Sequence, residues 1–270
     1  MQFPHHAVIV TAAGSSDRFN VNKRLSVKKE YLSIDGHTVL YRSVAPFLEV
    51  PGCQVIMVTH PEGMADQCAV ALEDLLQQNR VPIILVKGGD NRQKSVYNAL
   101  QMLTAMAMAV DFVVIHDGAR CFLTPDLVIK TLATATVFHG AVPAVPATDA
   151  LKIIDDNGVI MHHIDRMHAV GVQTPQIFKY PEIWEAHQAA KNSSTAYVDD
   201  TQIFTDYGEQ VGICEGDREN RKVTYIEDVP EAEQQIEAYL QNLEEGKRSA
   251  QAAKALHQAM DEVKRTQQTE

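Results

Sequence analysis

The N-terminal segment lacks both a basic region and a long apolar run. Its sequence, MQFPHHAVIVTAAG, has far fewer consecutive apolar residues than the roughly 20 that span a bilayer. We therefore expect neither a signal peptide nor a membrane segment, and we predict a cytoplasmic protein.

Cysteine is scarce. There is no C-x-x-C pair and no neighbouring histidine at zinc-finger spacing, which argues against a structural zinc site. This pattern indicates a reduced, cytosolic protein. The four cysteines are scattered at Cys53, Cys68, Cys121 and Cys214.

Positive charge is also in deficit, with a formal net charge of -11 over 270 residues. Nucleic-acid and anionic membrane surfaces attract proteins with a basic footprint, so neither is an expected partner. Any anionic ligand must be met by a local basic cluster. The 45% apolar composition is enough for a sizeable core, in one large α/β domain or two small ones.

Four β-branched runs are apolar almost throughout, as expected for a parallel sheet covered by helices on both faces. Helical patterns alternate with them, and the last opens with Thr124-Pro125 as N-cap and first-turn proline. The sequence predicts a doubly wound α/β fold with a mostly parallel, Rossmann-like sheet. The apolar runs are 7–13, 53–60, 82–89 and 111–119, and the helical patterns are 38–48, 62–78, 91–108 and 125–138.

The pattern changes after about residue 140, where residues 144–166 contain two alternating runs around Asp156-Asn157-Gly158. Asn-Gly predicts a two-residue hairpin turn because both positions accept a positive φ. We expect a β-hairpin arm that leaves the sheet. Its apolar face needs a covering surface, so we predict a homodimer formed through the arm.

Residues 227–270 are rich in Ala, Glu, Gln and Lys, and we expect a helix to about residue 245 followed by a polar helical tail. The predicted organisation is one domain over residues 1–240, with the arm inside it, and a C-terminal extension over residues 241–270. We assign the extension no chemistry.

Ligands of open α/β sheets bind beyond the carboxyl ends of the strands, so the loops after the apolar runs are candidate sites. The loop after Gly14 is neither a Walker A loop nor G-x-G-x-x-G. Arg18 and Lys29 supply side-chain charge suited to a polyphosphate. A solvated basic connection is the alternative, and it stays open for Lys23, Arg24 and Lys28.

A second candidate loop contains Gly88-Gly89-Asp90 before a predicted helix. Paired glycines let the backbone approach a flat ligand, and Ser95 offers a hydrogen bond there. A tight strand-to-helix turn capped by Asn91 is the alternative.

A third candidate, residues 113–120, places His116, Asp117 and Arg120 at the end of a strand. A carboxylate in this place suits Mg²⁺, which takes one or two carboxylates and leaves its other positions to phosphate oxygens and water. An Asp117–Arg120 ion pair in a turn is the alternative.

The segments after the arm are less specific. Asp199-Asp200 is typical of a helix cap, and Lys222 leads into a β-like run over 222–226, where a lysine is ordinarily exposed. His162-His163 is discounted as a metal pair, because adjacent residues of a strand point to opposite faces.

The order of these motifs resembles the 2-C-methyl-D-erythritol 4-phosphate cytidylyltransferase family, within the sugar-phosphate nucleotidyltransferase-like proteins. The resemblance runs from residue 7 to residue 240 and includes A-A-G, K-x-Y-L, G-G-x-x-R-x-x-S-V, H-D-x-A-R, Q-T-P-Q-x-F and N-x-K-V-T. It implies a transferase of isoprene biosynthesis that joins CTP and methylerythritol phosphate, with release of pyrophosphate and with Mg²⁺ as cofactor.

The resemblance also implies a role for each matching residue, and Arg166 is expected to reach across the dimer. The implied catalytic residues are Arg18, Lys29 and Lys222. The implied nucleotide-binding residues are Ala12, Ala13, Gly14, Gly89, Asp90, Ser95, Asp117 and Arg120. The implied substrate-binding residues are Asp149, Arg166 and Thr174, and the implied metal ligand is Asp117.

This assignment agrees with elementary electrostatics, because joining two phosphate anions requires concentrated positive charge more than a protein nucleophile. Two departures from the family pattern concern the substrate: Ala150 and Val198 replace common hydroxyl residues. They leave open a cytidylyltransferase for ribitol 5-phosphate or another polyol phosphate. A catalytically silent nucleotide-binding protein is the alternative from another class.

Overall fold

The computed structural model describes residues 3–19, 28–78, 80–238 and 241. By its internal contacts the chain divides into two compact units, residues 1–224 and 225–270. This division falls before the predicted domain end at residue 240. The predicted extension lies outside the described residues except for Gln241, as do Lys23 and Arg24, so those predictions stay untested.

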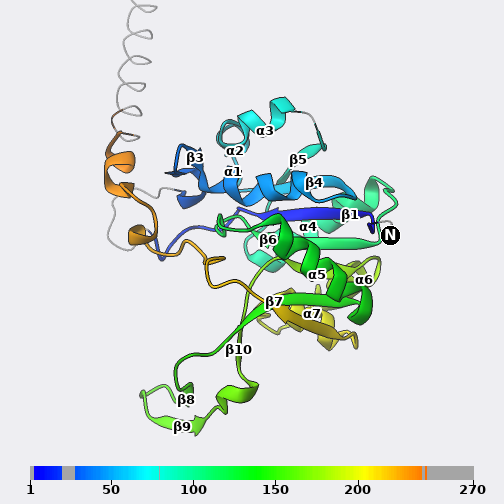
Figure 1. The fold of residues 1–270 in the computed structure, drawn as a ribbon, viewed down its shortest axis with the longest axis vertical. Helices are drawn as coiled ribbons and strands as arrows, with labels where there is room; N and C mark the ends of the chain where they lie inside the picture. Colours follow the sequence, from blue (N-terminus) through cyan, green and yellow to red (C-terminus); the bar gives the residue numbers. More distant parts are fainter. Residues whose placement is uncertain (1–2, 20–27, 79, 239–240, 242–270) are drawn as a thin grey trace, which may run out of the picture. The chain divides into compact units, whose positions relative to one another are not determined.

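An open sheet forms the centre of the first unit (Figure 1). In the described part of the chain eight strands join it, in the order β10-β7-β11-β6-β1-β4-β5, with β12 paired to β7. The pairs β6–β1, β1–β4 and β4–β5 are parallel, and β11 runs antiparallel between β6 and β7. The prediction of a mostly parallel sheet is confirmed. The strands are β1 (His6–Thr11), β4 (Cys53–His60), β5 (Ile83–Lys87), β6 (Phe112–Asp117), β7 (Gly140–Pro146), β10 (Val170–Val172), β11 (Gln176–Lys179) and β12 (Val211–Glu215).

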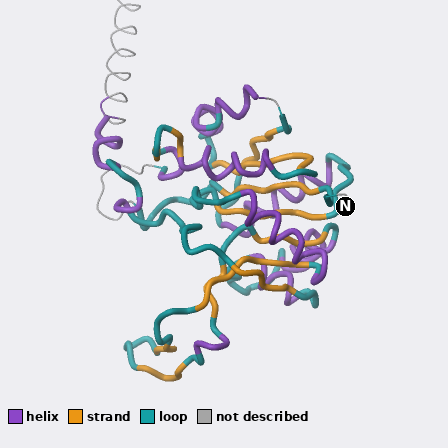
Figure 2. The backbone as a smooth tube through the Cα atoms, in the orientation of Figure 1, coloured by secondary structure: helices purple, strands orange, loops and turns teal. Residues whose placement is uncertain are grey.

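Helices surround this layer of strands (Figure 2). The Thr124 and Asn91 side chains accept hydrogen bonds from the first turns of α5 and α4, so both predicted caps are confirmed. The pattern over 62–78 forms two helices instead of one. The α-helices are α1 (Val39–Val44), α2 (Ala65–Ala71), α3 (Glu73–Gln78), α4 (Arg92–Ala105), α5 (Pro125–Phe138), α6 (Glu182–Ala190) and α7 (Asp200–Asp206). Shorter elements are η1 (Lys29–Tyr31), η2 (Ala45–Glu49), η3 (Arg166–His168), η4 (Ile226–Asp228) and the small hairpin β2 (Ser33–Ile34) and β3 (His37–Thr38).

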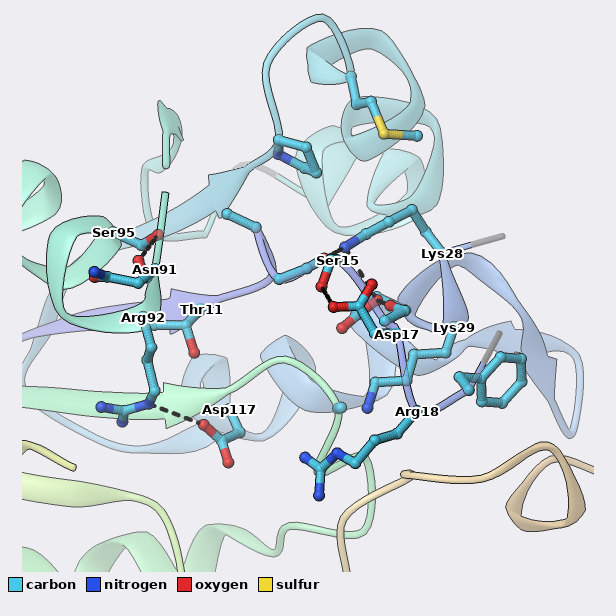
Figure 3. Close-up of a pocket in the computed structure, with 18 of the residues that line it drawn as sticks. Thr11, Ser15, Asp17, Arg18, Lys28, Lys29, Asn91, Arg92, Ser95 and Asp117 are labelled. Carbon is cyan, nitrogen blue, oxygen red and sulfur yellow. Dashed lines mark hydrogen bonds and ion pairs between the residues drawn. The ribbon is translucent and has the colours of Figure 1, made fainter. Parts of the chain in front are cut away.

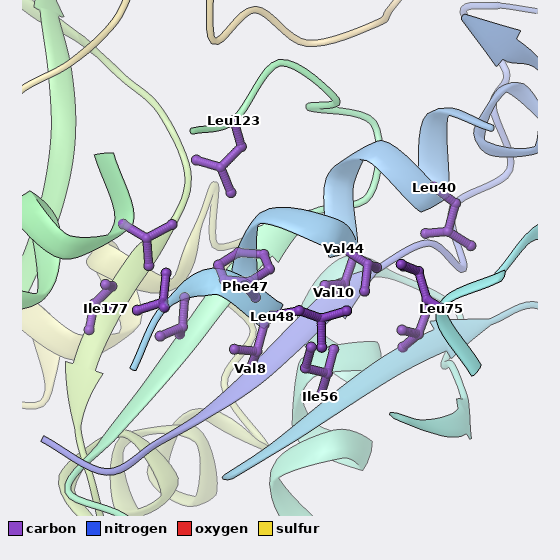
Figure 4. Close-up of a cluster of buried hydrophobic side chains, with 14 of the residues drawn as sticks. Val8, Val10, Leu40, Val44, Phe47, Leu48, Ile56, Leu75, Leu123 and Ile177 are labelled. Carbon is purple, nitrogen blue, oxygen red and sulfur yellow. The ribbon is translucent and has the colours of Figure 1, made fainter. Parts of the chain in front are cut away.

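Alternate residues of β1 enter two separate hydrophobic cores, because successive side chains of a strand point to opposite faces. Val8 and Val10 pack in one core with Phe47 of η2 (Figure 4). Ile9 packs on the other face in a core that includes Phe204 of α7. Covering both faces explains the continuous apolar runs, and it leaves the strand ends as the places where polar ligands can approach.

The arm leaves the sheet between β7 and β10 and carries β8 (Lys152–Ile154) and β9 (Ile160–His163), which pair with each other (Figure 1). The predicted hairpin is confirmed, but its two-residue turn is wrong. Only Gly158 in the turn has a positive φ, +79°. The Asp155 N–H donates to the Val159 carbonyl, and the Asp155 carboxylate accepts from the Asn157 and Val159 N–H groups, which favours a wider loop.

The predicted β-like run over 222–226 is also wrong, because residues 221–224 carry no regular secondary structure and η4 begins at Ile226. In the second unit a helical segment follows from residue 232 to residue 238. Within the described ranges, no helix combines the length and the hydropathy that crossing a membrane requires.

Candidate active site

A cavity of about 770 Å³ opens where β1, β4, β5 and β6 end, the carboxyl edge of the parallel strands (Figure 3). Its place is the one at which open α/β sheets bind ligands, and its volume suits a nucleotide-sized molecule. The structure brings most of the predicted site residues together here. Those in its walls are Ala13, Gly14, Arg18, Lys29, Gly89, Asp90, Ser95, Asp117 and Lys222.

The other predicted residues lie outside these walls. Ala12 is buried next to Ala13. Arg120 forms an ion pair with Asp117 but does not line the cavity. Asp149 and Arg166 are exposed in the arm segment. Their proposed contacts with substrate therefore stay predictions.

Two cationic residues of the cavity were not assigned from the sequence. Lys28, left undecided, is only 6% exposed, and its Nζ donates to the Gly14 carbonyl and lies 3.6 Å from Glu30 Oε2. Arg92 was missed entirely, although it is the arginine of the G-G-x-x-R motif. A residue in the first turn of a helix gives no local sign of the carboxylates that it meets in the folded chain.

The Gly88-Gly89 turn packs against the loop that follows β1. A Cβ atom on Gly88 would lie 2.2 Å from the Ala13 Cβ, so glycine permits this close approach. The Ser95 hydroxyl donates to the Asn91 carbonyl at 2.9 Å and accepts from the Gly89 N–H at 3.0 Å. The strand-to-helix turn capped by Asn91 is therefore confirmed, while Gly89 and Asp90 also line the cavity, so their contact with a ligand stays a prediction.

Asp117 lies at the end of β6 with its side chain 10% exposed and surrounded by cations. Its Oδ2 is 2.8 Å from Lys222 Nζ and 3.6 Å from Arg120 Nε, and its Oδ1 is 3.4 Å from Arg92 Nε. Burial raises the pKa of the Asp117 carboxyl, but the charges of Lys222 and Arg92 outweigh it and hold that pKa below its ordinary value. The predicted Asp117–Arg120 pair is thus part of a larger cluster, and Asp117 is an anion at neutral pH.

Lys29 is buried, with 7% exposure, and its Nζ donates to the Val223 carbonyl at 2.6 Å. Burial lowers the pKa of the Lys29 ammonium; Glu30 opposes this, while the positive charges of Lys222 and Arg18 lower the pKa further. Figure 3 shows the Lys29 and Arg18 side chains extending toward the part of the cavity that holds Asp117. A buried ammonium group beside other cations favours the binding of an anion, so Lys29 is a candidate anion-binding residue.

Thr174 holds the end of β6, where Asp117 lies. Its hydroxyl oxygen accepts from the Asp117 N–H at 3.1 Å and donates to His116 Nδ1 at 2.9 Å, while His116 Nε2 donates to the Arg120 carbonyl at 3.1 Å. Burial lowers the pKa of His116 to about 4, so the ring is neutral at pH 7. Thr174 is 4% exposed and lies outside the cavity walls, so its predicted contact with substrate stays a prediction.

The Asp199-Asp200 pair divides its roles. Asp199 caps α7 as predicted and accepts from the Gln202 N–H at 3.2 Å. Asp200 is wholly buried instead, where it accepts from Arg92 Nη1 and lies 3.0 Å from His187 Nε2. Burial raises the pKa of the Asp200 carboxyl, but Arg92 and His187 outweigh burial and lower it. The cap pattern alone did not reveal this buried ion pair.

Comparison with known proteins agrees with this geometry. The family model described as 2-C-methyl-D-erythritol 4-phosphate cytidylyltransferase matches residues 6–242. The enzyme of that name from Caldanaerobacter subterraneus is 34% identical over 228 residues, which are 84% of this chain and 96% of the relative. The one from Clostridium botulinum is 33% identical over 224 residues, 83% of this chain and 95% of the relative.

Solved structures show the same fold. The 4-diphosphocytidyl-2C-methyl-D-erythritol synthase of Anaerococcus prevotii superimposes with a TM-score of 0.71 at 26% identity, covering 88% of this chain and 96% of that chain. The 2-C-methyl-D-erythritol 4-phosphate cytidylyltransferase of Thermus thermophilus gives a TM-score of 0.65 at 27% identity, covering 86% and 98%.

Proposed function

This chain belongs to the 2-C-methyl-D-erythritol 4-phosphate cytidylyltransferase family, and from that premise we propose that the cavity at the carboxyl edge of the sheet is its CTP site. The activity is that of a CTP-dependent cytidylyltransferase acting on methylerythritol phosphate in isoprenoid biosynthesis. A substrate phosphate oxygen attacks the α-phosphorus of CTP, and pyrophosphate leaves.

The observation that carries this proposal is the convergence of Arg18, Lys29 and Lys222 beside the ionised Asp117. Both reactants are anions, so the barrier falls when preorganised cations neutralise the charge that concentrates at the α-phosphate. Arg18 and Lys29 hold the triphosphate in this proposal, and Lys222 approaches the α-phosphate. No general base is required, because the attacking phosphate is already largely ionised near pH 7.

The cytidine is held by backbone groups in this proposal. The two loops that meet at Gly88 supply them, with the Ser95 hydroxyl keeping the second loop in shape. The residues concerned are Ala12, Ala13, Gly14, Gly89, Asp90 and Ser95.

The residues of the cavity fit a divalent cation, Mg²⁺ in our proposal, that binds together with the nucleotide. Within the described residues no group of three or more potential metal-binding side chains exists, so a cation must take most of its ligands from phosphate and water. Asp117 is the carboxylate that would hold it, beside Lys222. When bound, the cation would act as a Lewis acid on the phosphate oxygens.

The arm supports a homodimer. Its strands expose Ile153, Ile160 and Met161 at 49%, 53% and 56%, and a two-stranded hairpin with apolar side chains in water on both faces is marginal by itself. A second copy of the chain would cover these residues. Arg166 would then reach the substrate phosphate at the partner's cavity, and Asp149 would bind the substrate. Buried Cys68 and Cys214 thiols are consistent with the proposed cytoplasmic location.

The direct test is pyrophosphate release by the purified protein with CTP, Mg²⁺ and either methylerythritol phosphate or ribitol 5-phosphate. We expect release with methylerythritol phosphate. Release with ribitol 5-phosphate alone would overturn the substrate, and release with neither would favour a binding protein.

Lys29→Ala should lower turnover about 10²–10³-fold, the usual cost of removing one preorganised transition-state contact. Near wild-type turnover would remove Lys29 from the mechanism, and Lys130→Ala, on the exposed face of α5, serves as the matched control.

A further inference from the structure

Two cations share the Asp117 carboxylate, and they are held in different ways. Lys222 Nζ lies 2.8 Å from Oδ2 and extends from a segment without regular structure, with its side chain 33% exposed. Arg92 Nε lies 3.4 Å from Oδ1 and belongs to the first turn of α4 (Figure 3). The Arg92 side chain is 28% exposed, close to the value for Lys222, so the difference between the two lies in the helix that carries the arginine.

Arg92 has a buried anionic anchor. Its Nη1 donates to Asp200 Oδ2, and Asp200 Oδ1 accepts from His187 Nε2 at 3.0 Å. Both Asp200 and His187 are 0% exposed, and the three side chains come from α7, α6 and α4. Removing Arg92 from Asp200 would leave a buried carboxylate without a cation, which is strongly unfavourable, so Arg92 is fixed in place.

The third cation near Asp117 cannot replace Arg92. Arg120 Nε lies 3.6 Å from Oδ2, the oxygen that Lys222 already occupies, and its Nη1 donates to the Asn220 carbonyl at 2.8 Å. Among the ion pairs of the described residues, Arg92 alone faces Oδ1.

The Lys222 ammonium has three N–H donors, so one can stay on Asp117 Oδ2 while the others meet a phosphate, and the position of Asp117 sets where Lys222 reaches. We propose that Arg92 is a positioning residue that holds Asp117 so that Lys222 is directed at the α-phosphate. Asp200 and His187 are its anchors. Arg92 thereby fixes Oδ1 of the Asp117 carboxylate, and without it Lys222 is no longer directed at the phosphate. This inference rests on the proposed function of Lys222.

The test is a double-mutant cycle on CTP affinity, measured by calorimetry with Mg²⁺ and without the second substrate. In the wild-type background Lys222→Met should weaken CTP binding at least about ten-fold, as expected for a charged hydrogen bond. In the Arg92→Gln background the same change should cost less than about three-fold, because Lys222 is no longer directed at the phosphate. Equal losses in the two backgrounds overturn the inference.

Arg92→Gln alone removes the arginine partner of the buried Asp200 and can impair folding, so the deciding background is Arg92→Gln/Asp200→Asn, which removes both charges. Ile203→Val is the control for destabilisation, because it creates a small cavity on the same helix as Asp200. In this variant Lys222→Met should keep its full effect on CTP affinity. A reduced effect in this control would make the coupling structural and overturn the positioning role.

Failure of the proposed function is distinguishable from failure of this inference. A wild-type protein that neither binds CTP nor releases pyrophosphate overturns both. An active wild-type enzyme with additive losses overturns only the role of Arg92.

Discussion

The Thr174 hydroxyl lies 2.9 Å from His116 Nδ1 and also accepts the backbone N–H of Asp117 at 3.1 Å. His116 completes the chain of hydrogen bonds by donating from Nε2 to the Arg120 carbonyl. One buried threonine, in the segment between β10 and β11, thus fixes the end of β6 at Asp117 and the turn that leads to Arg120. The shape of the active-site loop depends on a residue outside the cavity walls.

Thr174→Val should lower the free energy of unfolding by about 1–3 kcal/mol, because it leaves the His116 ring nitrogen and the Asp117 N–H without partners in a buried place. Urea denaturation measures the change. Thr134→Val is the matched control, since the Thr134 hydroxyl donates to the Lys130 carbonyl on an exposed part of α5. Equal losses in the two variants would contradict a buried role for the Thr174 hydroxyl.

Stability should decrease in mild acid. The pKa of His116 is lowered by burial to about 4 from 6.5, so between these values the unfolded chain binds a proton that the folded chain does not. The contribution of His116 is fully present above pH 6.5 and is lost as the pH falls toward 4, with a slope of up to about 1.4 kcal/mol per pH unit. The lowered pKa of Asp117 adds a further loss at still lower pH.

The check is urea denaturation of the wild type and of His116→Gln over pH 4 to 7. Glutamine does not titrate, so the variant should show a flatter dependence in this interval. Parallel curves would mean that another group causes the acid loss.

Activity should fall at a lower alkaline pH than an ordinary lysine would give. The lowered pKa of Lys29 means that its positive charge is lost earlier as the pH rises, and the free enzyme then loses a cation for the triphosphate. The pH profile of kcat/KM for CTP reports this group in the free enzyme. Lys29→Arg should move the alkaline limb upward, because the guanidinium stays protonated. Lys130→Arg, on the exposed face of α5, should leave the limb unchanged.

Ile160→Glu should convert a dimer into a monomer, because it places a charge in the apolar surface that we expect a second copy to cover. Sedimentation at micromolar concentration measures the mass. Lys152→Gln, which changes an exposed polar residue on the same hairpin, should stay dimeric. A monomeric wild-type protein would contradict the arm-mediated dimer directly.

The amino-acid sequence by itself determined the parts that depend on local pattern. Continuous apolar runs can be satisfied only between two helical layers, so β1, β4, β5 and β6 and their parallel arrangement were predictable. Short-range polar signals located the helix starts at Asn91 and Thr124, and the order of the motifs placed Lys29 and Asp117 in one site.

Tertiary structure alone decided the relations between residues far apart in the chain. Asp200 has the local pattern of a cap, but α7 packs against α6, and in the folded chain Asp200 is buried and paired with Arg92 of α4, 108 positions away. Thr174 meets His116 only because β11 lies beside β6 in the sheet. The turn of the arm is also shaped by hydrogen bonds to the Asp155 carboxylate, and it is wider than the Asn-Gly pair predicts. Hydrogen bonds and ion pairs between distant segments leave no periodic pattern, so the folded chain alone shows which cations meet at Asp117.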